Sequence, residues 1–305
     1  MNPVVVNNLE KSYGEIRAIS DINFEVEPGE IFGLIGPDGA GKTSIFRILA
    51  TLILPDNGIA FMGGHHVVKE YKKIRQIIGY MPGRFSLYQD LSVEENLNFF
   101  ASVFGTTIRE NYDLVKDIYS QIEPFKTRKA GALSGGMKQK LALSCALIHR
   151  PEILILDEPT TGVDAVSRKE FWEMLRRLRD KGITILVSTP YMDEASLCDR
   201  VALISGGNIM QINTPADIVE NFNRKLYGLH AENIYKMLDF LRNYTQTNSA
   251  YPFGQFIHFT PVNDGFNADM LKADLEKNGF KNFDIKEIKA GIEDCFMSLM
   301  DIKKT

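Results

Sequence analysis

The sequence is poor in cysteine and contains no long apolar run. Its three cysteines, Cys145, Cys198 and Cys295, lie far apart and form no C-x-x-C pair, which argues against a disulfide framework or a zinc site and is typical of buried thiols in a reducing compartment. The longest apolar stretches have the length of strands, far below the roughly 20 residues that cross a bilayer as a helix. The first residues contain neither a basic segment nor a long apolar segment, so no secretory signal is predicted. We therefore expect a soluble chain.

Positive charge is not in excess either. The 35 lysines and arginines are outnumbered by 39 aspartates and glutamates, which gives a net charge of −4. This balance argues against a protein that coats nucleic acid or anionic lipid. A length of 305 residues predicts about two domains, and an apolar content of 44% is enough for an ordinary core.

The first part of the chain, residues 1–221, alternates short β-rich runs with helical stretches. This alternation predicts an α/β domain with a buried, largely parallel sheet and a helical subdomain over about residues 83–150. Two capping boxes, at Ser92 and Thr107, are each expected to open a helix of this subdomain, and Gly206-Gly207 predicts a hairpin. The expected strands are residues 4–9, 22–26, 31–35, 153–156, 183–188 and 201–204.

Residues 222–305 are expected to form a small accessory α+β domain, because β-rich and helical runs continue there with different punctuation. The residues leave open whether this domain regulates, dimerises or only stabilises the chain. The expected strands are residues 226–230, 251–259 and 283–288, and the expected helices are residues 231–244, 267–278 and 291–300.

A glycine-rich loop is the most specific motif. Residues 36–43 match G-x-x-x-x-G-K-[ST] between an expected strand and an expected helix, as a phosphate-binding loop requires. Glycines allow the backbone amides to turn toward phosphate oxygens, and the helix N-terminus adds partial positive charge. Lys42 would reach the β- and γ-phosphates of a nucleotide, and the Thr43 hydroxyl would bind Mg²⁺. The expected nucleotide-binding residues of this loop are Gly36, Pro37, Asp38, Gly39, Ala40, Gly41, Lys42, Thr43 and Ser44.

Two carboxylates, Asp157 and Glu158, end a later apolar strand. Ligands bind at the carboxyl ends of strands in open parallel sheets, so Asp157 is expected to hold Mg²⁺ and Glu158 to polarise the attacking water, with Lys42 as the second catalytic residue. A strand that simply exits into a charged turn is the plainer interpretation, and the phosphate loop argues against it.

A second glycine cluster, residues 133–139, precedes another helical run. Ser134 alone would be interpreted as an ordinary N-cap, although amides at a helix start can also bind an anion. Together with the phosphate loop, the Asp157-Glu158 strand and residues 161–164, this cluster resembles the signature of the nucleotide-binding subunit of ABC transporters. The resemblance covers about residues 4–215 and implies a P-loop NTPase ABC cassette with a mixed, largely parallel sheet.

The resemblance implies roles for single residues. Tyr13 resembles the aromatic residue that stacks on adenine, a role that a partly buried tyrosine need not have. Ser134, Gly135 and Gly136 resemble the segment that grips the γ-phosphate of ATP bound to the opposite subunit, and Asp164 resembles the residue that couples the two sites. Catalysis would then belong to two cassettes that close head to tail around ATP and Mg²⁺.

Partners follow from the same resemblance. It implies an integral-membrane permease, a second ABC subunit that is identical or different, and no nucleic acid. Residues 80–82, 91–96 and 191–195 and the tail at 292–296 resemble bacterial multidrug-efflux and ABC-2-type exporters. The chain is therefore expected to be an ATPase on the cytoplasmic face of the inner membrane that powers export, with drugs, lipids and polysaccharides all compatible as substrates.

The helical subdomain is where the family binds its permease. Phe85, Leu87 and Tyr88 are candidates for this contact, and core packing of the subdomain is the alternative for each of them.

Two positions depart from the family pattern. Gly83 stands where the family has a glutamine that helps to bind Mg²⁺ and position water, and Pro190 where it has a histidine that contacts the γ-phosphate. We expect ATP binding to be intact and turnover impaired, since loss of one charge-stabilising group costs about 10²- to 10³-fold. Three explanations stay open: hydrolysis with altered groups, pairing with a different ABC subunit whose site Ser134, Gly135 and Gly136 complete, or an ATP-gated clamp that scarcely hydrolyses.

Two other protein classes fit the sequence less well. A soluble ABC protein of translation or DNA repair usually has fused cassettes, long insertions or basic arms, whereas this chain has one cassette and net negative charge. A P-loop kinase or GTPase would leave the Ser134 segment unexplained, and no guanine-reading N-K-x-D occurs.

Overall fold

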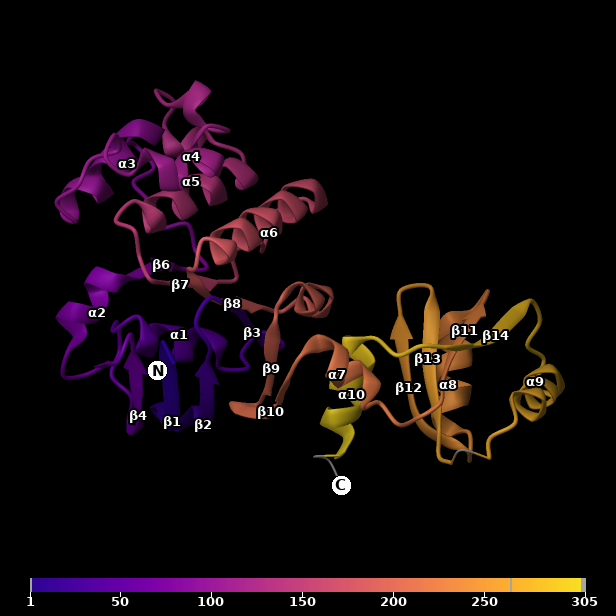
Figure 1. The fold of residues 1–305 in the computed structure, drawn as a ribbon. Helices are drawn as coiled ribbons and strands as arrows, with labels where there is room; N and C mark the ends of the chain where they lie inside the picture. Colours follow the sequence, from indigo (N-terminus) through magenta and orange to yellow (C-terminus); the bar gives the residue numbers. More distant parts are fainter. Residues whose placement is uncertain (1, 264, 303–305) are drawn as a thin grey trace. The chain divides into compact units, whose positions relative to one another are not determined.

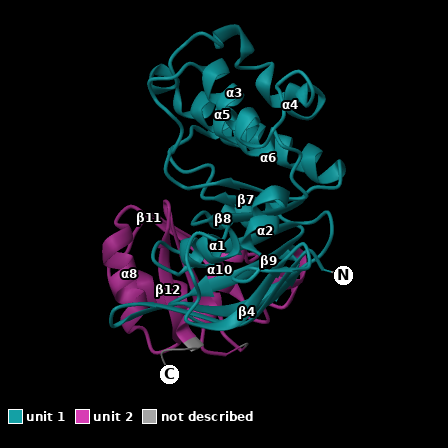
Figure 2. Cartoon of the chain, turned by 90° about the vertical axis from the view of Figure 1, so that its left-hand side faces the viewer, with its two compact units in different colours: residues 1–215 teal, residues 216–305 magenta. Residues whose placement is uncertain are grey.

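The computed structural model describes residues 2–263 and 265–302. The chain divides into two compact units, residues 1–215 and 216–305 (Figure 2). This division lies slightly before the one expected after residue 221, because helix α7 (Pro215–Glu220) falls almost entirely in the second unit. There the backbone carbonyl of Ile218 accepts a hydrogen bond from the Cys295 thiol at 3.5 Å. No helix among the described residues has the length and apolar character that a membrane crossing needs.

Unit 1 contains two sheets. The larger is mixed, with strand order β10-β9-β3-β8-β7-β6, and β9–β10 is its antiparallel pair. The smaller is antiparallel, with order β2-β1-β4-β5. These strands are β1 (Val4–Tyr13), β2 (Ile16–Val26), β3 (Ile31–Ile35), β4 (Asn57–Met62), β5 (His65–His66), β6 (Ile78–Met81), β7 (Ile153–Asp157), β8 (Thr184–Thr189), β9 (Arg200–Ser205) and β10 (Asn208–Asn213).

Burial explains which of these strands the sequence reveals. All residues of β3, β7 and β8 are buried, so these strands are nearly continuous apolar runs. The first half of β4 is exposed and β5 has two residues, so neither carries a clear pattern. The expected largely parallel sheet is the six-stranded one, and β1, β2, β4 and β5 form a separate antiparallel sheet that the sequence pattern did not distinguish from it.

The helices of unit 1 have two locations. Helix α1 joins the main core through Ile45, Phe46, Ile48 and Leu49, which pack with residues of both sheets. Figure 1 shows α3, α4 and α5 gathered at one end of the unit and β1, β2 and β4 at the other, with β7 and β8 between them. The helices are α1 (Lys42–Leu49), α2 (Tyr71–Ile77), α3 (Val93–Val103), α4 (Tyr112–Tyr119), α5 (Gly135–Leu147) and α6 (Ala165–Asp180), with short 3₁₀ helices η1 (Glu123–Phe125), η2 (Ala130–Ala132) and η3 (Met192–Leu197).

Both expected capping boxes exist, but only one opens a helix directly. The Ser92 hydroxyl accepts a hydrogen bond from the Glu95 amide at 3.2 Å, and the Glu95 carboxylate accepts one from the Ser92 amide at 2.7 Å. Thr107 and Glu110 make the same reciprocal pair, yet α4 begins only at Tyr112. The expected helix start at Thr107 was wrong: residues 108–111 form a turn, and the Asn111 side-chain amide donates to the Ile148 carbonyl at 2.7 Å, a long-range contact that local sequence does not reveal.

We expect Ser92→Ala to lower the free energy of unfolding by about 1 kcal/mol, because it removes the side-chain half of the α3 capping box. Urea denaturation followed by circular dichroism measures this difference. Ser120→Ala, on the exposed end of α4, is the control and should change the free energy of unfolding by less than about 0.5 kcal/mol. Equal values for the two variants would contradict the prediction.

Unit 2 has the split β-α-β-β-α-β arrangement, with antiparallel strand order β12-β13-β11-β14. Its own core contains Leu229, Met237, Phe259 and Leu271, from the sheet and from α8 and α9. The expected single strand over residues 251–259 was wrong: Gly254, with φ of 59°, turns the chain between β12 and β13. The elements are β11 (Leu226–Ala231), α8 (Ile234–Asn243), β12 (Thr247–Phe253), β13 (Phe256–Pro261), α9 (Ala268–Lys277), β14 (Phe283–Ile288) and α10 (Ile292–Ile302).

Candidate nucleotide-binding site

The phosphate loop joins β3 to α1 and passes very close to neighbouring backbone. Gly41, the N-cap of α1, has φ of 102°, and a Cβ there would lie 2.6 Å from the Ala18 carbonyl oxygen. A Cβ on Gly36 would lie 2.1 Å from the Ile204 carbonyl oxygen. Only glycine satisfies both positions. The N-cap of α1 makes no side-chain hydrogen bond, so the first-turn amides of this helix are available to an anion.

Lys42 brings a buried cation to this loop. Its ammonium donates hydrogen bonds to the carbonyl oxygens of Gly36 at 2.8 Å and Pro37 at 3.0 Å. The same nitrogen lies 3.3 Å from a carboxylate oxygen of Glu158, and the lysine side chain is only 3% exposed. The phosphate loop and the end of β7, far apart in the sequence, therefore meet at one charged contact.

Asp157 and Thr43 form a second contact between the same two elements. The Thr43 hydroxyl donates to the Asp157 carboxylate at 3.2 Å, and the buried Ser188 hydroxyl donates to the same oxygen at 2.7 Å. Ser188 lies opposite Asp157 in the parallel pairing of β7 and β8. Three oxygen-bearing side chains thus gather where the carboxyl ends of two strands meet the start of α1.

Glu158 is held in an unusual backbone conformation. Its φ of 49° lies in the left-handed region, which non-glycine residues adopt at some energetic cost. The Glu158 amide donates to both the carbonyl oxygen and the hydroxyl of Ser188, at 3.1 and 3.0 Å. These hydrogen bonds stabilise the sharp turn after β7 that brings the carboxylate back to Lys42.

The surroundings fit a triphosphate with its metal ion. A cavity of about 250 Å³ is lined by Ala18, Glu158 and the six residues 39–44, so it combines loop amides, one ammonium and one carboxylate. The hydroxyl of Thr43 and the carboxylate of Asp157 are hard oxygen ligands of the kind that Mg²⁺ prefers. The residues present therefore suit Mg·ATP.

Tyr13, the candidate adenine-stacking residue, lies beside this cavity. Its hydroxyl is 3.4 Å from the Ser44 hydroxyl, in the first turn of α1. The tyrosine side chain is 46% exposed, and the Lys11 ammonium is 5.8 Å from its ring centroid. An exposed ring next to the phosphate loop is available for stacking on a base.

The Ser134 cluster lies at a helix start but contacts a different part of the chain. The Ser134 hydroxyl accepts a hydrogen bond from the Met137 amide at 3.3 Å as N-cap of α5. A Cβ on Gly136 would come within 2.7 Å of the Ser167 hydroxyl, and one on Gly135 would lie 3.5 Å from the Gly162 carbonyl oxygen. This cluster therefore packs against residues that follow Glu158, while residues 39–44 line the cavity.

Asp164 caps the next helix. Its carboxylate accepts hydrogen bonds from the amides of Val166 at 3.1 Å and Ser167 at 3.0 Å. The hydrogen bonds of Ser167, followed by that of Val166, hold the pKa of Asp164 below its usual value. The carboxylate at the start of α6 is therefore ionised at neutral pH.

Gly83 and Pro190, the two positions that depart from the family pattern, lie at the site itself. A Cβ on Gly83 would lie 3.1 Å from the Asp157 carbonyl oxygen and 3.8 Å from the Glu158 Cβ, so this loop passes directly beside the backbone that carries both carboxylates. Pro190 follows β8, whose last residue, Thr189, accepts a hydrogen bond from the Gly36 amide at 3.3 Å. Neither residue has a side chain that can donate a hydrogen bond to a phosphate.

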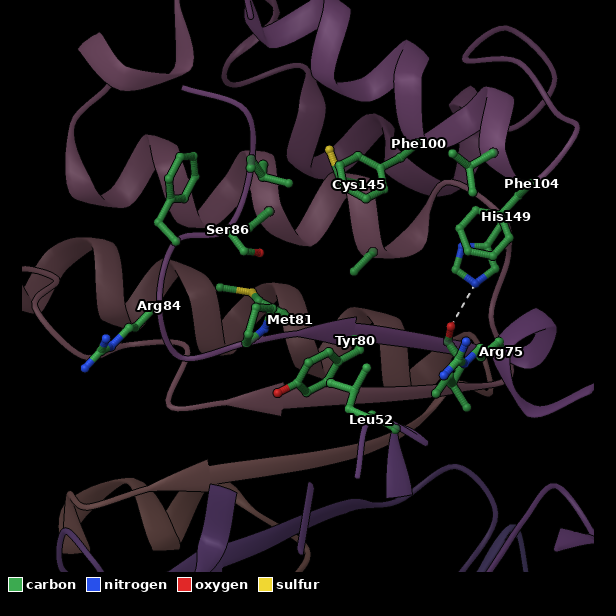
Figure 3. Close-up of a pocket in the computed structure, with 18 of the residues that line it drawn as sticks. Leu52, Arg75, Tyr80, Met81, Arg84, Ser86, Phe100, Phe104, Cys145 and His149 are labelled. Carbon is green, nitrogen blue, oxygen red and sulfur yellow. Dashed lines mark hydrogen bonds between the residues drawn. The ribbon is translucent and has the colours of Figure 1, made fainter. Parts of the chain in front are cut away.

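An apolar groove lies between the core of unit 1 and its helical subdomain. Its volume is about 490 Å³, and its lining combines residues of β6, such as Tyr80 and Met81, with Phe100 and Val103 of α3 and Cys145 of α5. Figure 3 shows Tyr80, Met81, Phe100 and Cys145 between the strands and the helices, with Arg84 pointing away from them.

His149 closes one end of this groove. Its ring stacks on Phe104 with centroids 3.8 Å apart, and its Nε2 lies 2.9 Å from the Ile78 carbonyl oxygen, the dashed line in Figure 3. Burial lowers the pKa of His149, so the ring is neutral at pH 7 and donates this hydrogen bond. The groove thus ends in an uncharged aromatic wall.

The permease-contact candidates have different environments. Leu87 is 8% exposed and lines the groove, whereas Tyr88 is 51% exposed and packs edge-on against Phe99. Phe85 also lines the groove and lies under the Lys138 ammonium, which is 5.5 Å from its ring centroid.

Sequence reasoning missed Ser188 as a member of the site. The signal was available, because a polar residue at the end of an apolar strand is expected to lie beside other strand ends in a parallel sheet. It also missed Glu194 and Arg168, which approach the residues after Glu158 only through tertiary packing.

Comparisons with known proteins agree with this geometry. Residues 19–161 match the family model "ABC transporter". The chain is 40% identical over 217 residues to a probable multidrug ABC transporter ATP-binding protein, YbhF, of Escherichia coli. This match covers 70% of the chain but 38% of YbhF, so the chain spans well under half the length of that relative. The Nod factor export ATP-binding protein I of Burkholderia lata is 39% identical over 222 residues, which cover 72% of this chain and 73% of that protein.

Solved structures lead to the same family. An ATP-binding subunit of an ABC transporter superposes with a TM-score of 0.65 at 27% identity, over 72% of this chain and 92% of its own. A dimeric, post-hydrolysis ATP-binding cassette with ADP and Pi gives a TM-score of 0.64 at 26% identity, over 69% of this chain and 98% of that one. The expected ABC cassette fold is therefore confirmed, and with the extensive match to the Burkholderia protein, the chain belongs to the ATP-binding subunits of ABC transporters.

Proposed function

We propose that this chain binds Mg·ATP at residues 36–44, pairs head to tail with a second ABC subunit, and hydrolyses the ATP to power an export permease. The convergence of Lys42, Thr43, Asp157 and Glu158 at one cavity carries the proposal. Exporter relatives, named for multidrug transport and Nod factor export, support the direction of transport. We place the chain at the cytoplasmic face of the inner membrane through its permease.

Each site residue has a physical role in this proposal. The Lys42 ammonium and the loop amides would bind the phosphates, and Glu158 would accept a proton from the attacking water. Mg²⁺, held by Thr43 and Asp157, would neutralise charge on the β- and γ-phosphates. Ser134, Gly135 and Gly136, at the start of α5, would offer their N-terminal amides to the γ-phosphate of the partner subunit's ATP.

Association driven by ATP tests this proposal. Glu158→Gln protein is mixed with saturating Mg·ATP or Mg·ADP, alone and with candidate ABC subunits, and its mass is measured by light scattering. A dimer that forms with ATP and not with ADP supports the proposal. A chain that remains monomeric with every candidate at saturating Mg·ATP contradicts it.

The apolar groove is the proposed contact for the permease. It has a volume of about 490 Å³ and is lined mainly by apolar side chains, and it lies next to the Gly83 loop, which touches the backbone of Asp157. A helix that inserts an apolar side chain there would bury apolar surface from both parts of unit 1. Movement at the groove would thereby reach the ATP site directly.

We expect Val103→Glu to weaken binding of the permease and leave ATP affinity unchanged, because a charge would enter the apolar groove. Val103 lines the groove and is 61% exposed, so its replacement costs little folding stability. Co-purification from detergent-solubilised membranes and fluorescence titration with a nucleotide analogue measure the two quantities. Val68→Glu, at another exposed valine (39%), is the control, and equal permease recovery from both variants would argue against the groove.

Gly83 and Pro190 favour a second candidate function. Two groups that would stabilise charge at the bound γ-phosphate are missing, while the Ser134 cluster is complete. The chain would then bind ATP, hydrolyse it slowly, and complete the competent site of a different ABC partner. An ATP-gated clamp with scarcely any turnover is a further form of the same idea.

The rate of phosphate release separates these candidates. A brisk rate from the chain alone, abolished by Glu158→Gln, contradicts both the dependent subunit and the clamp. Release that appears only when a second ABC subunit is added, and that requires Ser134 of this chain, supports the dependent subunit.

A further inference from the structure

Glu194 is a buried carboxylate outside the nucleotide cavity. It lies in η3, shortly after Pro190, and is 1% exposed. One of its oxygens, Oε1, accepts a hydrogen bond from the Thr160 hydroxyl at 2.8 Å, and Thr160 is also 1% exposed. Burial of a carboxylate costs free energy unless the charge is paired. The neighbours of Glu194 therefore determine what this residue contributes.

Arg168 supplies the opposite charge. Its Nε lies 3.6 Å from Oε1 of Glu194, and its Nη1 lies 3.7 Å from a carboxylate oxygen of Asp193. Its guanidinium carbon is 4.2 Å from the ring centroid of Tyr191, a favourable cation–π distance. Arg168 in the first part of α6 thus contacts three residues of the segment 191–194.

The ion pair is close but not hydrogen-bonded. A separation of 3.6 Å exceeds a normal N–H···O distance. In the described part of the chain, Nε of Arg168 and Oε2 of Glu194 are both buried and have no hydrogen-bond partner. Native proteins rarely leave such groups unpaired. A displacement of α6 by less than about 1 Å would bring Nε within hydrogen-bond distance of Glu194.

These contacts join the chain that follows Glu158 to the segment that follows β8. Thr160 follows Glu158 by two residues, and Arg168 follows Asp164 by four. Both reach back to the segment 191–194, which continues from the end of β8. The chain between Glu158 and α6 is therefore attached at both ends to the segment that follows Pro190.

We propose that Glu194 and Arg168 are positioning residues that fix residues 158–164, and with them the Glu158 carboxylate, against the end of β8. This inference rests on the proposed ATP-dependent function. Pro190 has no side-chain donor that could connect the bound phosphate to residues 191–194. The contact between Arg168 and Glu194 therefore provides the connection between the end of β8 and the loop after Glu158.

Two single substitutions and their combination test the Arg168–Glu194 contact by its effect on the rate of ATP hydrolysis. Glu194→Gln keeps an acceptor for Thr160 and removes the charge that faces Arg168, and Arg168→Met removes the cation. We expect each to lower kcat for ATP hydrolysis about tenfold with KM for ATP unchanged, and the double variant to be no slower than either single variant. Arg179→Met is the matched control on α6, because Arg179 makes an ion pair with Asp199 at 2.7 Å, and its kcat should equal that of the unsubstituted chain.

Hydrogen exchange of the full chain with and without Mg·ATP gives a readout that does not depend on turnover. We expect ATP to slow exchange at residues 36–44 and 158–168 of the unsubstituted chain, and at 36–44 only in Glu194→Gln. Equal slowing of exchange at residues 158–168 in both proteins would overturn the positioning role of Arg168 and Glu194. Loss of this slowing in Arg179→Met would overturn it as well. Failure of ATP to slow 36–44 in the unsubstituted chain would contradict the proposed function itself. If Glu194→Gln does not fold, the double variant, which removes both buried charges, takes its place.

Discussion

Glu158→Gln lowers the rate of ATP hydrolysis by about 10²- to 10⁴-fold, the usual contribution of a general base, and leaves ATP affinity close to that of the unsubstituted chain. Glutamine has the size of glutamate but cannot accept the proton of the attacking water. The phosphate loop keeps its own contacts, since the Lys42 ammonium also donates hydrogen bonds to the carbonyl oxygens of Gly36 and Pro37. Single-turnover phosphate release and equilibrium binding measure the two quantities.

Glu152→Gln is the matched control for this experiment. Glu152 immediately precedes β7, is exposed, and makes backbone hydrogen bonds to Ile77 and Thr184 that the substitution preserves. Its rate of hydrolysis should be unchanged. Hydrolysis by Glu158→Gln at the unsubstituted rate would exclude Glu158 as the base and would direct attention to other groups at the carboxyl ends of β7 and β8.

Lys42→Ala weakens ATP binding by about 10- to 100-fold, which corresponds to the loss of one or two hydrogen bonds to a charged group. The substitution removes the buried cation that would contact the phosphates. Because the β- and γ-phosphates are its expected partners, we expect the loss to be much larger for ATP than for AMP. Calorimetric titration with each nucleotide measures the affinities.

The folded state of Lys42→Ala must be verified in the same experiment. Loss of the ammonium leaves the Gly36 and Pro37 carbonyls without this donor and Glu158 without its ion-pair partner, so the melting temperature should fall as well. Lys181→Ala, which removes an exposed lysine paired with Asp117 at 3.2 Å, is the control for charge. A Lys42→Ala protein that melts normally and binds ATP with unaltered affinity would contradict the assignment of this loop.

The sequence predicts the parts of the site that depend on local pattern. The glycines of the phosphate loop, Lys42 and the two carboxylates at the end of β7 stand in short motifs whose chemistry requires those residue types in that order. Their neighbours in space are also partly predictable, because parallel strands end at the same edge of a sheet. The contacts of Lys42 with Glu158 and of Thr43 with Asp157 are the geometry that such reasoning leads one to expect.

Features set by tertiary contacts were not predictable in this way. The hydrogen bond between Asn111, just before α4, and Ile148 joins distant parts of the chain, and the pairing of Glu194 with Thr160 joins residues 34 positions apart. The hairpin at Gly254 was hidden because apolar residues continue on both sides of the turn. That Gly83 lies near the expected Mg²⁺ ligand Asp157 follows from the family resemblance, whereas its close approach to the Asp157 backbone depends on the pairing of β6 with β7.

The separate hydrophobic core of the second unit has an evolutionary consequence. Leu229, Met237, Phe259 and Leu271 pack with one another and with their neighbours, so this module does not borrow its interior from the cassette. The matches to the Escherichia coli and Burkholderia lata relatives extend over 217 and 222 residues, about the size of the first unit. Because a domain with its own core can fold by itself, the sequence of the second unit can change without disturbing the packing of the ATP-binding unit.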